Sequence, residues 1–217
     1  MLFLGFSSGL PYILLISTST AWLRDVNVDL SYIGFFTWIT FTYTFKFAWA
    51  PLVDRFSIPF LAQYGHRKSW IAFMQILIFL SLLFISNIDP IENFILFCMV
   101  GATIAFAGSI QDIAIDAFRI EYAHISDQGN LAASYQLGYR LAIIAATSIA
   151  LIFADINGWS MTFKLMAGLM CLGLLGVIFS KEEKNKELGK LNFINSIVEP
   201  LKDFFSRFGM FMASILL

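Results

Sequence analysis

The sequence predicts an all-α membrane protein with six transmembrane helices and the start of a seventh. Of its 217 residues, 59% are hydrophobic and 13% are charged, whereas a soluble domain has about 45–50% apolar and about 25% charged residues. The mean hydropathy is +0.76, so a polar surface cannot cover the chain and most of its solvent must be lipid. Apolar stretches long enough to cross a bilayer as helices also follow one another along the chain.

Six apolar stretches have this length, and together they form the first predicted domain, residues 1–179. Their expected bounds are 2–22, 31–52, 70–87, 93–112, 131–154 and 161–179. The polar segment 180–203 is expected to be a connector with an amphipathic helix, because its apolar residues recur at helical spacing. Residues 204–217, at about 1.5 Å per residue, are too short to cross a core of about 30 Å. We therefore expect an incomplete seventh transmembrane helix, and a piece of a larger transporter-sized chain.

Lysine and arginine indicate how the helices are oriented in the membrane. The loop after the second stretch holds Arg55, Arg67 and Lys68, and residues 180–203 hold five lysines. The loops on the opposite side hold mostly aspartate and glutamate. By the positive-inside rule, we expect the N-terminus and residues 180–203 to lie in the cytoplasm.

Acidic residues at the end of the fourth stretch are candidates for function, because charges inside an apolar span are costly unless they are paired or used. Asp116 follows Asp112 by one helical turn, and Arg119 comes three residues later. A carboxyl group shielded from water is able to carry a proton across a membrane. These three residues are therefore predicted to serve proton coupling or a gate. A structural latch between Asp116 and Arg119, with Asp112 balancing Lys46, remains open, and Glu121 is expected to be solvated.

Two cations lie deeper in the apolar stretches. Arg140 is about 14 Å into the fifth stretch and Lys46 about 9 Å into the second, at about 1.5 Å per residue. Arginine grips a carboxylate with two parallel hydrogen bonds, and lysine offers a point charge. We predict that both cations bind an anionic small-molecule substrate. The alternatives are a buried ion pair that locks helices together for Arg140, and snorkelling to the membrane interface for Lys46.

Other functional classes find little support in the sequence. The chain has two histidines and two cysteines, the latter in separate apolar stretches, which makes a zinc site improbable. No cofactor or catalytic residue is predicted. An intramembrane aspartyl protease needs two acids from different helices, whereas Asp112 and Asp116 share one. The net charge of −1 gives no indication of a nucleic-acid partner. Because none of these enzyme patterns is present, we expect a non-enzyme whose partners are lipid, a solute and protons.

The loop after the second stretch resembles a known family. It reads Ala-Pro-Leu-Val-Asp-Arg over 50–55 and Gly-His-Arg-Lys over 65–68. This is similar to the Gly-x-Leu-x-Asp-Arg…Gly-Arg-Arg signature of the major facilitator superfamily, with Pro51 as a departure. The wider spacing before Gly65 resembles the AmpG-like muropeptide permeases. Five blocks of residues resemble that family in the expected order: 5–11, 21–25, 43–55, 111–119 and 138–140.

The resemblance implies the N-terminal half of a major facilitator bundle in a bacterial inner membrane. Its activity would be proton-coupled import of N-acetylglucosaminyl-1,6-anhydro-N-acetylmuramyl peptides, from periplasm to cytoplasm, for peptidoglycan recycling. By the same resemblance, Asp54 and Arg55 would belong to a cytoplasmic gate that engages charges at the end of the fourth span.

Two alternatives remain open at this point. The acidic block of the fourth stretch is also similar to eukaryotic acetyl-coenzyme A transporters, and coenzyme A is anionic as well. The chain alone would also leave a water-lined face against lipid, which is costly. It is then expected either to pair with a separate C-terminal half chain or to be a truncated, non-transporting half.

Overall fold

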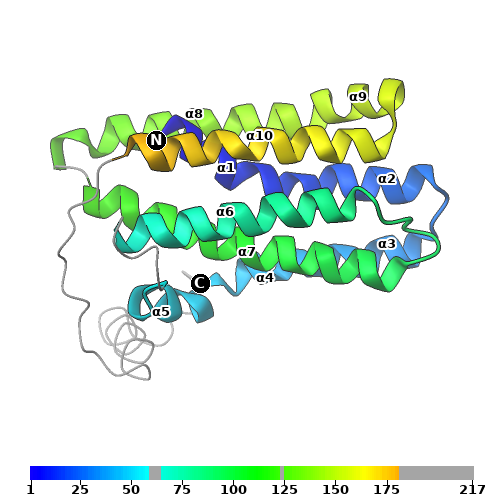
Figure 1. The fold of residues 1–217 in the computed structure, drawn as a ribbon, viewed down its shortest axis with the longest axis horizontal. Coiled ribbons are helices and arrows are strands. Elements are labelled where there is room, and N and C mark those ends of the chain that lie inside the picture. Colours follow the sequence, from blue (N-terminus) through cyan, green and yellow to red (C-terminus); the bar gives the residue numbers. More distant parts are fainter. Residues whose placement is uncertain (59–64, 123–124, 181–217) are drawn as a thin grey trace, which may run out of the picture.

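The chain forms a bundle of long helices that lie side by side (Figure 1). The structure, a computed structural model, describes residues 1–58, 65–122 and 125–180, and in these ranges it has helices and no strand. Five continuous helices are long and apolar enough to cross a membrane: Leu2–Asp25, His66–Ile85, Phe94–Glu121, Gln128–Asn157 and Trp159–Phe179. The predicted helical membrane fold is thus confirmed in class, with five such helices in the described part of the chain.

Two of these five helices contain a π-helical segment at their middle. The first consists of α1 (Leu2–Ile13), η1 (Leu14–Thr18) and α2 (Ser19–Asp25). The fifth predicted stretch consists of α8 (Gln128–Ile144), η5 (Ala145–Ile149) and α9 (Ala150–Asn157). The Thr18 hydroxyl donates a hydrogen bond to the Ala146 carbonyl oxygen. The two irregular segments therefore lie at the same depth and contact each other, and each supplies a bend that lets its helix follow its neighbour.

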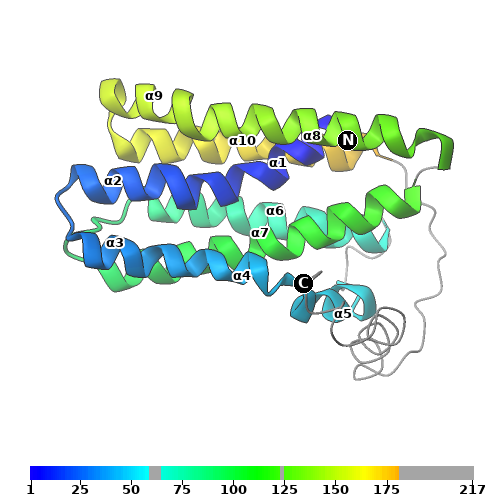
Figure 2. The same cartoon turned by 180° about the vertical axis from the view of Figure 1, so that it is seen from behind.

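The second predicted stretch, 31–52, is interrupted and does not form one continuous helix. It consists of α3 (Leu30–Thr37), a short 3₁₀ segment η2 (Trp38–Thr40), α4 (Phe41–Thr44) and α5 (Lys46–Arg55). Three threonine hydroxyls bond back to carbonyl oxygens three residues earlier, which favours tighter turns: Thr37 to Gly34, Thr40 to Thr37, and Thr42 to Ile39. Figure 2 shows α3 and α4 following the bundle and α5 placed at its end.

The helix of the fourth stretch continues past residue 112, where the apolar stretch ends. α7 runs from Phe94 to Tyr122, so that Asp112, Asp116 and Arg119 lie on one helix, as the sequence predicts for the two acids. Acidic residues in its last turns pair with cations of neighbouring helices: Asp116 with Lys46 and Glu121 with Arg67. The remaining helical elements in the described residues are α6 (His66–Ile85), α10 (Trp159–Phe179) and a short 3₁₀ segment η4 (Ile125–Asp127).

The helices form two layers, with α1, α2, α8, α9 and α10 in one and α3, α4, α6 and α7 in the other (Figures 1 and 2). α1 is the most enclosed, and its residues from Leu4 to Pro11 are buried. It approaches α8 closely, because a Cβ added at Gly5 would overlap the Tyr135 carbonyl and one at Gly138 would overlap the Leu2 carbonyl. Small residues at such crossings are how membrane helices pack without a hydrophobic driving force.

The two ends of the bundle differ in their charged residues. At one end, called here the Asp54 end, the last residues of α5 meet the first turn of α6 and the last turns of α7. At the other, called the Asp25 end, the Trp159 indole donates to the Asp25 carboxylate at 2.7 Å and ties α10 to α2. The predicted connector, 180–203, and the predicted start of the seventh helix, 204–217, lie outside the described residues except for Ser180.

Candidate functional site

Asp112 is the centre of a polar network that joins four helices. One of its carboxylate oxygens accepts hydrogen bonds from the Ser8 hydroxyl at 2.6 Å and the Tyr135 hydroxyl at 3.0 Å. Its other oxygen accepts one from the Lys46 ammonium at 2.9 Å. These donors come from α1, α8 and α5, while Asp112 itself belongs to α7. The side chain of Asp112 is only 16% exposed, so these donors replace much of the water that a carboxylate otherwise needs.

Lys46 lies between two carboxylates. Its ammonium is 2.9 Å from Asp112 and 4.0 Å from Asp116. Asp116 also approaches the Arg119 guanidinium at 3.4 Å, and Arg119 lies over the Tyr135 ring at 5.3 Å from its centroid. The structure thus brings together four residues that sequence reasoning singled out, Lys46, Asp112, Asp116 and Arg119. Both contacts of the predicted latch are present: Asp116 with Arg119, and Asp112 with Lys46.

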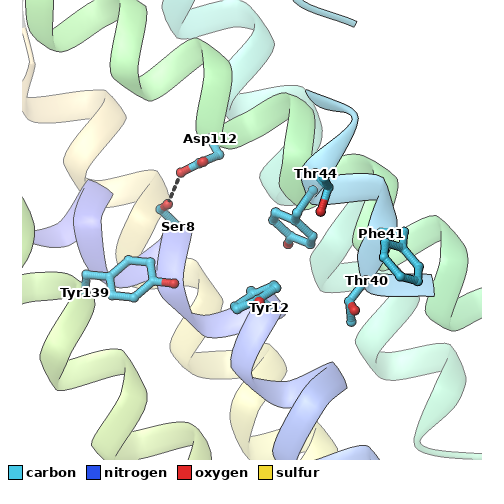
Figure 3. A pocket seen from close by; sticks show the side chains of 8 residues that line it. Ser8, Tyr12, Thr40, Phe41, Thr44, Asp112 and Tyr139 are labelled. Atoms are coloured by element: carbon cyan, nitrogen blue, oxygen red, sulfur yellow. Dashed lines mark hydrogen bonds between the residues drawn. The ribbon is translucent and has the colours of Figure 1, made fainter. Parts of the chain in front are cut away.

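A cavity of about 300 Å³ opens beside this network. Figure 3 shows Ser8, Asp112 and Tyr139 on one side of it and Thr40, Phe41 and Thr44 on the other. Aromatic rings and hydroxyl groups dominate its lining, and Asp112 is the charged member among the described residues that line it, which are Ser8, Tyr12, Thr40, Phe41, Tyr43, Thr44, Asp112 and Tyr139. The cavity therefore suits a polar ligand with an apolar face.

Sequence reasoning missed most of the residues around this cavity. Ser8 and Tyr12 are spaced by one helical turn, and so are Tyr135 and Tyr139, which places each pair on one helix face. That spacing of polar groups inside apolar stretches was the available signal. It is weak, because a tyrosine or serine is common in a packed membrane helix.

Arg140 lies outside this cavity. It follows Tyr139 on α8, its side chain is exposed, and it forms no ion pair or hydrogen bond with the residues that the structure describes. The structure therefore does not join Arg140 with Lys46, the other predicted substrate-binding cation. It also gives no support to a buried ion pair that locks α8 to a neighbour among the described residues.

A second charged cluster lies at the Asp54 end. The Arg67 guanidinium donates to the Asp54 carboxylate at 2.6 Å and to the Glu121 carboxylate at 3.0 Å. Arg67 is 11% exposed, so this bridge holds α5, α6 and α7 together in a partly shielded position. Arg55 is the last residue of α5, next to Asp54. Glu121, expected to be solvated, is exposed and in addition pairs with Arg67, which sequence reasoning did not choose as a site residue.

A third polar cluster is buried next to the first. The Ser7 hydroxyl accepts hydrogen bonds from the side-chain amides of Gln75 at 3.0 Å and Gln111 at 3.1 Å, and donates to the Leu4 carbonyl oxygen. The side chains of Ser7, Gln75 and Gln111 have no exposed surface. The cluster connects α1, α6 and α7 at the depth of the Asp112 network.

Metal ligation has no geometric basis in the described ranges, since no group of three histidine, cysteine, aspartate or glutamate residues there is placed to hold an ion.

Comparison with known proteins agrees with this architecture. The chain is 33% identical over 211 residues to the putative transporter AmpG 4 of Rickettsia conorii, covering 94% of this chain and 51% of that protein. It is 34% identical over 208 residues to the anhydromuropeptide permease of Escherichia coli K12, covering 95% and 42%. An uncharacterized protein of Haemophilus influenzae is 32% identical over 213 residues, with 97% and 49% covered. The chain thus spans about half the length of the curated relatives it matches.

The likeness extends over the whole chain at the level of the family. Residues 1–217 match the family model of the Major Facilitator Superfamily, and the described residues contain several helices of membrane-spanning length. The chain therefore belongs to the major facilitator superfamily.

Proposed function

We propose that this chain forms the N-terminal half of a proton-coupled importer of anhydromuropeptides in a bacterial inner membrane. The observation that carries this proposal is Asp112, a shielded carboxylate that faces a polar cavity inside an apolar bundle and is held by Lys46, Ser8 and Tyr135. The names of relatives supply the solute class, since one is an anhydromuropeptide permease.

The position of Lys46 between two acids supports the proposed proton coupling. When Asp112 takes up a proton, it becomes neutral and loses its ionic attraction for Lys46. Asp116, at 4.0 Å from the same ammonium, then remains as the charged partner of Lys46. A shift of Lys46 from Asp112 toward Asp116 would loosen α5 from the middle of α7. This links the protonation state of one residue to the packing of two helices.

The Asp54 end is proposed as the cytoplasmic gate. In this orientation the N-terminus lies in the cytoplasm, and the Arg67 bridge joins the three helices that close that side. Asp54 engages the end of α7 through Arg67, which contacts Glu121. Asp116 and Arg119 lie along α7 between this bridge and the cavity, which supports a gate whose two clusters open and close together.

Arg140 is proposed to bind the carboxylates of the peptide part of the substrate. Its exposed side chain has no partner among the described residues, and a charge facing lipid is costly. We infer that the second half of the transporter, on the same or a separate chain, covers this face of α8 and encloses the substrate there.

Uptake of radiolabelled anhydromuropeptide into spheroplasts that lack their own permease tests the function. The chain is expressed alone and together with the C-terminal half of the Escherichia coli relative. We expect accumulation that collapses with the pH gradient and is lost in Asp112→Asn, whereas Asp155→Asn, an exposed acid near the Asp25 end, retains it. No uptake in either arrangement, or exchange of acetyl-coenzyme A instead, contradicts the proposal.

A further inference from the structure

The lining of the cavity beside Asp112 has a chemical character that proton coupling does not require. Among the described residues, no lysine or arginine lines it, and the single charged group among them, Asp112, is already neutralised by Lys46 from outside the cavity. The remaining lining groups are aromatic rings and hydroxyls. An anionic group placed here would approach a carboxylate without meeting a cation, which disfavours it.

Several hydroxyl groups around the cavity are available to a ligand. Those of Tyr12, Thr44 and Tyr139 form no hydrogen bond with any residue that the structure describes. A hydroxyl both donates and accepts, so this set matches a ligand whose own polar groups do the same. Uncharged sugars carry hydroxyls of this kind around their rim.

The aromatic rings are held in place by their neighbours. The rings of Tyr12 and Tyr43 pack edge to face with centroids 4.8 Å apart. Tyr139 lies beside Tyr135, with ring centroids 6.5 Å apart. Rigid aromatic surface binds at a low cost in conformational entropy. The C–H face of a pyranose ring is apolar and packs against such a surface, while its hydroxyls reach the polar groups at the edge.

The size of the cavity limits how much of a ligand it holds. Small-molecule sites span about 300–1,000 Å³, and this cavity, at about 300 Å³, is at the lower bound. It therefore accommodates a single ring with its substituents and leaves the rest of a larger solute outside.

We propose that this cavity is a subsite for an uncharged saccharide ring, and that the charged part of the transported molecule binds outside it. The inference rests on the proposed transport function, since it assigns one part of the solute to this cavity. The sequence predicted that Lys46 and Arg140 both bind the substrate anion. In this proposal Lys46 instead pairs with Asp112, and Arg140, on the exposed side of α8, binds the anionic part of the solute.

Three probes with the same ring and different charge test the subsite. N-acetylglucosamine is neutral, N-acetylmuramic acid is anionic and glucosamine is cationic. Binding to the purified chain in lipid nanodiscs is measured by saturation-transfer NMR, which detects weak ligands. We expect N-acetylglucosamine to bind more tightly than the two charged sugars. Tighter binding of either charged sugar, or no binding of any probe, overturns the proposal.

Two cavity variants and one matched control locate the binding. Loss of a hydroxyl in Thr44→Val or of a ring in Tyr12→Leu is expected to raise the dissociation constant for N-acetylglucosamine up to about tenfold. Thr42→Val lies on the same helix as Thr44, but its hydroxyl bonds to Ile39 and does not line the cavity, so it should bind normally. Equal affinities in all three variants overturn the proposal.

Failure of the subsite and failure of the proposed function give different results. Muropeptide uptake that is inhibited by the free stem peptide but not by N-acetylglucosamine overturns the subsite and leaves the importer intact. Saccharide binding with the expected charge preference, in a protein that takes up no muropeptide, supports the subsite and contradicts the importer.

Discussion

Gln111 and Asp112 are consecutive residues of α7, yet their side chains belong to two separate polar networks. Gln111 donates to Ser7 in a buried cluster, and Asp112 accepts from Ser8 at the edge of the cavity. The partners, Ser7 and Ser8, are themselves consecutive on α1. Two adjacent contacts therefore connect the same two helices, one shielded from the cavity and one facing it. The shielded contact fixes the separation of α1 and α7 at the point where Asp112 must meet Ser8.

Ser7→Ala tests the contribution of the buried cluster to stability. The substitution removes the acceptor for two buried amide groups, on Gln75 and Gln111. A buried polar group that loses its partner costs about 1–3 kcal/mol, so the thermal unfolding midpoint of the purified chain should fall clearly. Ser134→Ala serves as the control, because its hydroxyl bonds only within its own helix. Equal midpoints for the two variants would contradict the cluster's role.

Gly173→Ala tests the close packing of α10 against the same cluster. A Cβ at this position would overlap the Gln75 amide and the Ser7 side chain. Overpacking of this kind costs about 1–3 kcal/mol, and we expect a lower unfolding midpoint. Gly168 lies on the same helix with nothing within 4 Å of an added Cβ, so Gly168→Ala should be neutral or slightly stabilising. A loss of stability in Gly168→Ala alone would refute the packing argument.

Sequence reasoning found the helical class of the fold, because hydropathy and length determine where a bilayer can be crossed. Hydropathy ends the fourth apolar stretch at residue 112, whereas the helix itself continues to Tyr122. Charges lower the hydropathy of its last turns. The sequence offered the pairing of Lys46 with Asp112 only as one alternative and did not indicate that of Arg67 with Glu121. The breaks inside residues 31–52 were missed for a related reason. They depend on threonine hydroxyls that bond locally, which hydropathy does not register.

The candidate site was predicted in part, for reasons that follow from residue type. Lys46, Asp112 and Asp116 stand out in any apolar stretch, because an unpaired charge there is costly. The pairing of Arg67 with Glu121 joins residues that are distant in sequence, and nothing in their local pattern indicates it. Tyr12 and Tyr139 were missed because tyrosine is unremarkable in a membrane helix, and only the three-dimensional arrangement gives them a common cavity.

A double-mutant cycle measures the bridge at the Asp54 end. Arg67→Gln and Glu121→Gln each break the same 3.0 Å contact, so their effects on the free energy of unfolding should not add. We expect a coupling energy of about 0.5–3 kcal/mol, as found for residues in one salt-bridge network. Arg67→Gln combined with Glu92→Gln, at the opposite end of the bundle, should be additive. Additivity in both cycles would mean that the bridge contributes nothing to stability.

Charge removal at the centre of the site should be rescued by a second substitution. Lys46→Gln leaves the Asp112 carboxylate without its ionic partner in a shielded position, which we expect to destabilise the protein by about 1–3 kcal/mol, since Lys46 is itself partly exposed. Lys46→Gln combined with Asp112→Asn removes both charges and should recover most of that loss, although proton-coupled uptake stays abolished. Thermal unfolding and uptake, measured on the same three variants, separate the two effects. Recovery of uptake in the double variant would exclude Asp112 as the coupling residue.

Arg140→Ala separates substrate binding from structure. Because Arg140 is exposed and has no partner among the described residues, its removal should leave membrane insertion and the unfolding midpoint unchanged. Uptake of anhydromuropeptide should nevertheless be abolished, since the anionic part of the solute loses its cation. Lys164→Ala, on α10 and also exposed, controls for the loss of one positive charge and should transport normally. A protein that fails to fold after Arg140→Ala would instead assign this arginine a structural role, in contact with the half of the transporter that covers α8.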